Sequence, residues 1–138
     1  MRATVPHTRF GLPEVHGSIY PSGGATVKLI HQLGYVHAME LLLTTPLIDA
    51  MPAAQIGLVN RVVPTEGLMP WALAPAATIA ANSPTAVQAV HQQISTTMAE
   101  QGRAREALDQ TLGDRVRASP HFTEGVTALR HQRQPHYP

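Results

Sequence analysis

The residues that follow Pro64 carry helical patterns and no strand pattern, and this constrains the fold more than any other feature of the sequence. Residues 66–81 are apolar and alanine-rich, but Pro75 predicts a break or a kink, because proline in a helix interior costs about 3 kcal/mol. Ser83 and Pro84 form a typical helix start, with serine as the N-cap and proline at the first helical position. The second half of the chain is therefore expected to consist of helices.

Further signals divide this helical region. An apolar stripe with a spacing of about 3.6 residues follows Pro84 and consists of Val87, Val90, Ile94 and Met98. We expect Gly102 to separate this helix from a second helix at residues 103–118. A last short helix is expected at residues 123–130, followed by a loose tail at residues 132–138.

The first half of the chain alternates short elements. Residues 2–5 and 58–63 are rich in β-forming side chains and are expected to be strands. Apolar periodicity predicts helices at residues 23–34 and 36–44, and Asp49 is a plausible N-cap for a third helix that ends at Gly57. The predicted fold class is therefore α+β, dominated by helices.

Composition narrows the class of protein. The 138 residues suit one domain, and a net charge of +1 gives no reason to expect a nucleic-acid or anionic-membrane partner. There are no cysteines, no apolar segment that resembles a signal peptide, and no apolar run near the roughly 20 residues that span a bilayer. We expect a soluble, cytoplasmic protein that does not bind a membrane.

One acid, Glu14, stands among apolar residues, namely Phe10, Leu12, Pro13 and Val15. Removal of water around a carboxylate raises its pKa toward neutrality, where the group can both take and give a proton. The alternative, which spacing alone favours, is a turn acid that caps the backbone or pairs with Arg9.

Other motifs are weaker. The PSGGAT segment at residues 21–26 could expose backbone N–H groups to an anion, but the favoured interpretation is a tight turn that lets a helix approach a sheet. The eight histidines include no pair with the spacing of a zinc-binding helix, so no metal site is expected. The serines lack the G-x-S-x-G motif of a nucleophile elbow.

Several segments, in the right order, resemble the C-terminal half of the enoyl-CoA hydratase/isomerase (crotonase) family. RFGLPEV at residues 9–15 and IYPSGGATVKL at residues 19–29 match the family's R-F-G-x-P-E-V stretch and its P-x-G-G-x-T-x-x-L turn. Residues 33–64 match its A-M-E-L-x-L-T-G and G-L-V-N-x-V-V-P segment, and residues 79–94 its S-P-x-A-V segment. Residues 119–137 resemble its terminal E-G-x-x-A-F-x-x-K-R-x-P-x-F segment.

This resemblance implies a function and a site. Glu14 would be the catalytic acid/base at the α-carbon of a fatty acyl-CoA thioester, and the loop at residues 19–24 would line the acyl pocket. The substrate-binding residues implied in this way are Ile19, Tyr20, Pro21, Gly23 and Gly24. No cofactor is implied, because CoA is part of the substrate. Either hydration or double-bond isomerisation would fit.

The resemblance also implies that the chain is one partial crotonase-like domain. Residues 1–63 would hold the glutamate loop, short helices and a strand, and residues 64–138 the C-terminal helical region. The family's β-spiral core and oxyanion-hole donors have no counterpart here, so we expect a complementing N-terminal half or a homo-oligomer as partner. The alternative is a non-catalytic remnant or oligomerisation subunit, in which Val27, Leu29, Val59 and Val62 would lack apolar partners.

Overall fold

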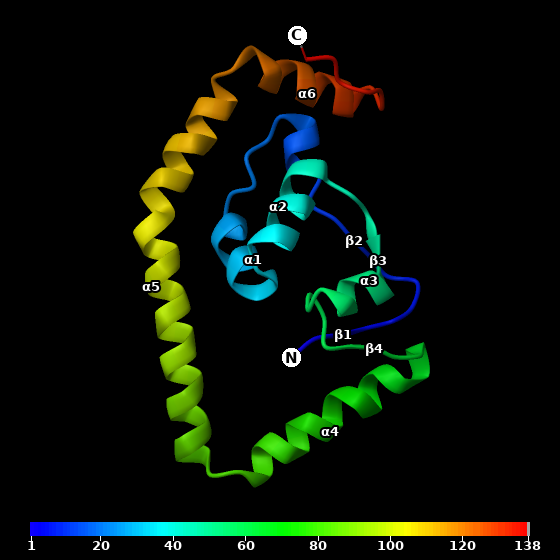
Figure 1. Ribbon diagram of the computed structural model, residues 1–138, viewed down its shortest axis with the longest axis vertical. Coiled ribbons are helices and arrows are strands. Elements are labelled where there is room, and N and C mark those ends of the chain that lie inside the picture. Colours follow the sequence, from blue (N-terminus) through cyan, green and yellow to red (C-terminus); the bar gives the residue numbers. More distant parts are fainter. Residues whose placement is uncertain (138) are drawn as a thin grey trace. The chain divides into compact units, whose positions relative to one another are not determined.

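A computed structural model describes residues 1–137 and confirms a chain dominated by helices, with short strands (Figure 1). The α-helices are α1 (Ala25–Leu33), α2 (Tyr35–Thr44), α3 (Ala50–Gln55), α4 (Leu68–Ala81), α5 (Pro84–Arg117) and α6 (Pro120–Arg130). Two short 3₁₀ helices are η1 (Glu14–Gly17) and η2 (Thr65–Gly67). The strands are β1 (Ala3–Thr4), β2 (Arg9–Phe10), β3 (Ile48–Asp49) and β4 (Arg61–Val62).

The chain divides into two compact units. One unit contains Met1–Phe10 and Ile48–Gln101, and the other contains Gly11–Leu47 and the described residues from Gly102 on. Helix α5 contributes its first part to one unit and its second part to the other. The predicted division of one partial domain into residues 1–63 and residues 64–138 stays a prediction.

The first unit is built on two small strand pairs. β1 pairs with β4 in parallel, and β2 pairs with β3 in an antiparallel register that places Arg9 opposite Asp49. The strand expected at residues 58–63 is shorter than predicted, because the Leu58 N–H donates to the Ala53 carbonyl at 2.9 Å and continues the turn after α3. Val59 is 5% exposed, so the expectation that it lacks partners is wrong.

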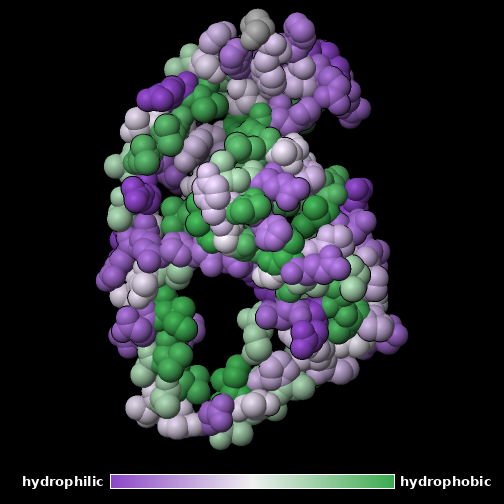
Figure 2. Space-filling model, in the orientation of Figure 1, coloured by the Kyte–Doolittle hydropathy of each residue, from purple (hydrophilic) through white to green (hydrophobic). Residues whose placement is uncertain are grey.

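The expected helix break at Pro75 and the expected helix boundary at Gly102 are both wrong, whereas the alternative of a kink at Pro75 stays a prediction. Helix α4 continues through Pro75, because a proline removes one backbone hydrogen bond while the alanine-rich remainder of the helix keeps its own. Helix α5 continues through Gly102, because a single glycine costs about 1 kcal/mol, which good helix formers on both sides offset. Figure 2 shows apolar surface along α4 and the first part of α5, where these side chains are exposed: Met69, Leu73, Ile79, Val90 and Ile94.

The second unit contains the packed pair α1 and α2, which Figure 1 shows side by side. Its apolar core includes Leu33, Ala38, Leu41 and Leu42, and all four are less than one-tenth exposed. The same unit contains η1, the second part of α5, and α6, which packs against η1.

Helix α6 begins at Pro120 and not at Thr123 as predicted. Ser119 is its N-cap, and the Ser119 hydroxyl accepts a hydrogen bond from the Phe122 N–H at 3.3 Å. Ser119 and Pro120 thus repeat the serine–proline start that the sequence analysis recognised at Ser83.

The tail after α6 is anchored, contrary to the expectation of a loose segment. Arg133 donates to both carboxylate oxygens of Glu124, at 2.6 and 2.8 Å, and the His136 N–H donates to the same carboxylate at 2.8 Å. The Tyr137 hydroxyl donates to the His16 carbonyl at 2.7 Å. Pro138, the last residue of the predicted tail, lies outside the described residues. Within residues 1–137, no helix is both long and apolar enough to cross a bilayer.

Candidate active site

The predicted acid, Glu14, is the first residue of η1. Pro13 precedes it with φ near −80°, which suits the entry to a tight turn, and the Pro13 carbonyl accepts the His16 N–H at 3.1 Å. The turn ends at Ser18, which adopts a left-handed φ of 52°. The Ile19 N–H then donates to the Glu14 carbonyl at 2.8 Å, so the acid and the following loop are joined directly.

The Glu14 side chain is half-buried, and its Oε2 atom is buried without a hydrogen-bond partner among the residues that the structure describes. Arg9, the partner that the alternative interpretation proposed, instead forms an exposed ion pair with Asp49 at 3.4 Å. A buried carboxylate oxygen without a partner is unusual in a folded protein, because its desolvation is not offset.

Glu14 lines a cavity of about 310 Å³. Pro13 is the one expected apolar neighbour among the lining residues, and the further apolar wall comes from Ile19 and Leu129. The complete lining combines the η1 segment, α6 and the tail, and consists of Pro13, Glu14, His16, Gly17, Ile19, Gly125, Leu129, Gln132, Arg133 and Pro135. Sequence reasoning missed the contribution of α6 and the tail.

The close approach of α6 to η1 depends on Gly125, which is buried. A Cβ atom at this position would collide with the Gly17 carbonyl and with the Tyr137 hydroxyl. The Tyr137 ring also meets the ring of His121 edge to face, with centroids 5.5 Å apart. Burial, followed by the charge of Glu124, raises the pKa of Tyr137, whose hydroxyl donates the hydrogen bond to the His16 carbonyl.

The carboxylate of Glu124 holds the tail against α6. The Arg133 hydrogen bonds and then the His136 N–H lower the pKa of Glu124 to about 2, so the acid stays ionised. The same contact raises the pKa of Arg133. Arg133, fixed by Glu124, is therefore a polar residue in the lining of the cavity, which also includes Gln132 and the apolar Leu129.

The turn at residues 19–24 follows η1 and ends at the start of α1. Gly23 and Gly24 have φ values of 78° and 77°, a left-handed conformation that other residues adopt only with strain, and this explains the glycine pair. Pro21 is buried, and Lys28 on α1 donates to the Gly23 carbonyl at 3.1 Å. The glycine pair therefore forms a tight turn, as the simpler interpretation of the PSGGAT segment predicted.

Asp109 on α5 binds both ends of this turn. Its Oδ1 accepts the Tyr20 hydroxyl at 2.8 Å, and its Oδ2 accepts the Gly24 N–H at 3.3 Å. Burial, and then the hydrogen bond to Asp109, raise the pKa of Tyr20. No local pattern in the sequence marks Asp109, because its partners lie 85 and 89 residues away.

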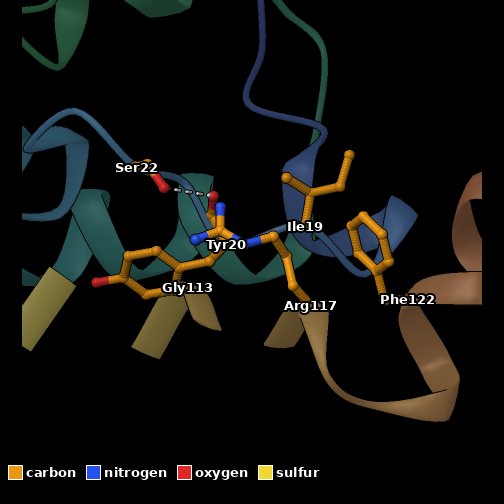
Figure 3. A pocket seen from close by; sticks show the side chains of 6 residues that line it. All are labelled: Ile19, Tyr20, Ser22, Gly113, Arg117 and Phe122. Atoms are coloured by element: carbon orange, nitrogen blue, oxygen red, sulfur yellow. Dashed lines mark hydrogen bonds between the residues drawn. The ribbon is translucent and has the colours of Figure 1, made fainter. Parts of the chain in front are cut away.

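A second cavity of about 250 Å³ lies beside the turn. Figure 3 shows its lining side chains, with Ile19, Tyr20 and Ser22 from the turn and Gly113, Arg117 and Phe122 from α5 and α6. Of the predicted substrate-binding residues, Ile19 lines both cavities and Tyr20 lines this one. Pro21, Gly23 and Gly24 shape the turn without lining either cavity. Across residues 1–137, no three His, Asp or Glu side chains gather in a way that could hold a metal ion.

Comparison with known proteins gives consistent matches. A family model described as enoyl-CoA hydratase/isomerase matches residues 3–138. An enoyl-CoA hydratase of Mycobacterium tuberculosis is 35% identical over 137 residues, which are 99% of this chain and 52% of that protein. A 2,3-dehydroadipyl-CoA hydratase of Escherichia coli is 33% identical over 95% of this chain and 51% of its own length.

The solved structures agree with these matches. An enoyl-CoA hydratase/isomerase from Pseudoalteromonas atlantica superposes with a TM-score of 0.86 at 26% identity, over 99% of this chain and 55% of that one. A carnitinyl-CoA hydratase from Mycobacterium avium superposes with a TM-score of 0.85 at 28% identity, over 98% of this chain and 53% of that one. The chain thus spans about half the length of the relatives that it matches.

Proposed function

Because the chain belongs to the enoyl-CoA hydratase/isomerase family, we propose that it acts on fatty acyl-CoA thioesters by proton transfer at the α-carbon, with Glu14 as the acid/base. The observation that carries this proposal is the half-buried Glu14 carboxylate, whose Oε2 has no partner in the described chain and which lines a cavity of about 310 Å³. That volume lies at the lower end of the roughly 300–1,000 Å³ of ligand pockets, which suits a short acyl group.

The proposed chemistry follows from the thioester. Hydration adds water oxygen at C3 of the enoyl group and a proton at C2, whereas isomerisation moves a proton between C2 and C4. Both reactions place negative charge on the thioester oxygen, which needs N–H donors for stabilisation. In either reaction Glu14 would carry the proton, and the thioester itself would activate the α-carbon, so the proposal needs no metal or prosthetic group.

We propose that turnover needs a complementing N-terminal half, because the chain spans about half of its relatives. That half would supply the oxyanion donors, and the residues described here would supply the acid and the turn. Loss of one such donor costs about 10²–10³ in rate in other enzymes, so the separate chain is expected to show little activity.

Glu14→Gln tests the role of the acid in the complemented protein, with crotonyl-CoA as substrate. The amide keeps the shape of the side chain and cannot exchange a proton at neutral pH, so we expect hydration and isomerisation to fall by about 10²–10⁴. Glu40→Gln is the matched control, because Glu40 is exposed on α2. If Glu14→Gln keeps activity within tenfold of the parent, the assignment of Glu14 is wrong.

A second candidate function is a non-catalytic remnant or oligomerisation subunit of the same family. The exposed apolar side chains on α4 and α5, among them Leu73 and Ile94, favour it, because such surface promotes association. Size-exclusion chromatography with light scattering distinguishes the two. Self-association without any crotonyl-CoA turnover in the complemented protein would favour this candidate, and a stable monomer would count against it.

A further inference from the structure

Within residues 19–24, the turn from Tyr20 to Gly24 is bound at both ends by Asp109 on α5. Its two carboxylate oxygens have separate partners: Oδ1 accepts the Tyr20 hydroxyl and Oδ2 accepts the Gly24 N–H. The carboxylate is half-buried, which strengthens hydrogen bonds to a charged acceptor. The turn is therefore fixed at its first and last residues by one side chain of another element.

The start of α1 needs such a partner. Gly24 is the N-cap of α1, and as a glycine it offers no side chain to satisfy the first N–H groups of the helix. A carboxylate near a helix N-terminus is also favoured by the helix dipole. The turn's other bonds are local: the Ser22 N–H donates to the Tyr20 carbonyl at 2.8 Å, and Lys28 donates to the Gly23 carbonyl.

The position of the turn affects the candidate site through Ile19. Ile19 precedes Tyr20, lines the Glu14 cavity as well as the second cavity, and donates its N–H to the Glu14 carbonyl. A displacement of Tyr20 would therefore move a wall of the Glu14 cavity. We propose that Asp109 is a positioning residue that holds the Tyr20–Gly24 turn in the conformation needed for binding an acyl-CoA, an inference that rests on the proposed function.

Asp114 provides a matched control on the same helix. Its carboxylate pairs with Arg117 and accepts hydrogen bonds from Gln110, and both partners are on α5 itself. Replacing either aspartate removes one acidic group from α5, but only the change at Asp109 removes the acceptors of Tyr20 and Gly24.

The test compares Asp109→Ala, Asp109→Asn and Asp114→Ala by two measurements. Amide hydrogen exchange at residues 22–26 reports the order of the turn without any ligand. Steady-state kinetics with crotonyl-CoA on the complemented protein report KM and kcat separately. We expect Asp109→Ala to accelerate exchange and raise KM, each by about tenfold, with a smaller effect on kcat. Asp109→Asn should restore much of both, because an amide can accept from Gly24 and donate to Tyr20.

Each outcome decides between the two proposals. Unchanged exchange at residues 22–26 in Asp109→Ala, or an equal effect of Asp114→Ala, overturns the positioning role. Turnover by the parent with an unchanged KM in Asp109→Ala overturns this inference alone and leaves the proposed function standing. Absence of turnover by the complemented parent overturns the proposed function, and the inference about acyl-CoA binding fails with it. If Asp109→Ala does not fold, Tyr20→Phe can replace it, because it removes only the hydrogen bond between the Tyr20 hydroxyl and Asp109. We expect it to raise KM by less than the tenfold expected for Asp109→Ala.

Discussion

Replacing Gly125 by alanine will destabilise the protein, because α6 packs against η1 with no room for a side chain. A Cβ at Gly125 would collide with the Gly17 carbonyl and lie 2.9 Å from the Tyr137 hydroxyl. The first of these is a backbone atom, so a rotamer change cannot relieve the collision. Either α6 or η1, which begins with Glu14, must move.

The expected change in the free energy of unfolding is the difference between one stabilising and two destabilising contributions. Alanine gains about 1 kcal/mol over glycine inside a helix. Overpacking typically costs about 1–3 kcal/mol, and displacement of Tyr137 would also remove its hydrogen bond to His16, which contributes about 1 kcal/mol. The free energy of unfolding should therefore fall by about 1–3 kcal/mol.

Gly102→Ala is the matched control, because it makes the same chemical change inside a helix where the added Cβ would meet no atom within 4 Å beyond the adjoining helix backbone. It should raise the free energy of unfolding by about 0.5–1 kcal/mol. Urea unfolding followed by far-ultraviolet circular dichroism measures both variants. If Gly125→Ala raises the midpoint as Gly102→Ala does, the close packing of α6 on η1 is incorrect.

Three further changes test other contacts. Pro75→Ala should raise the free energy of unfolding in urea by about 1–3 kcal/mol, because it restores a backbone donor inside α4. Ser119→Ala should lower it by about 0.5–2 kcal/mol, because the Phe122 N–H loses its acceptor; Ser119→Asn should recover the loss. The pKa of Glu124 falls from 4.5 to about 2 on folding, so its contact with Arg133 stabilises the protein above pH 4.5 and is lost as the pH falls toward 2. The difference in Tm between parent and Glu124→Gln should therefore be largest above pH 4.5 and should shrink steadily as the pH falls to 2 and below, and a constant difference would contradict this.

The sequence predicted the fold class, and the comparisons confirm it: the chain is the helix-dominated C-terminal half of a crotonase-like fold. Periodicity placed α1 and α2 close to their observed positions, and the Asp49 N-cap with the stop at Gly57 did the same for α3. Predictions failed where a single residue was given too much weight. Pro75 and Gly102 are unfavourable inside helices, but the helix-forming residues on both sides of each offset the cost.

Long-range contacts explain the remaining differences. The tail lacks any helical or strand pattern, yet Arg133 and Tyr137 fix it to Glu124 and His16, the latter 121 residues away. The role of Asp109 could not be predicted for the same reason. In the sequence, an aspartate on a helix that binds a distant turn looks the same as a solvated one such as Asp114. The start of α6 is different: the Ser119–Pro120 signal was present and was missed.

The acid and its surroundings therefore differ in how far the sequence could predict them. Glu14 stood out because of its immediate neighbours, but Leu129 and the tail, which complete its cavity, belong to segments more than a hundred residues away. Stability alone gives no reason to keep a buried Oε2 without a partner, because an unsatisfied buried acceptor costs about 1–3 kcal/mol. Departures from such local rules are expected at functional sites, where another requirement offsets the cost. The proton exchange with a bound acyl-CoA that we propose for Glu14 would provide that requirement, because an oxygen without a partner in the described chain is free to contact a substrate.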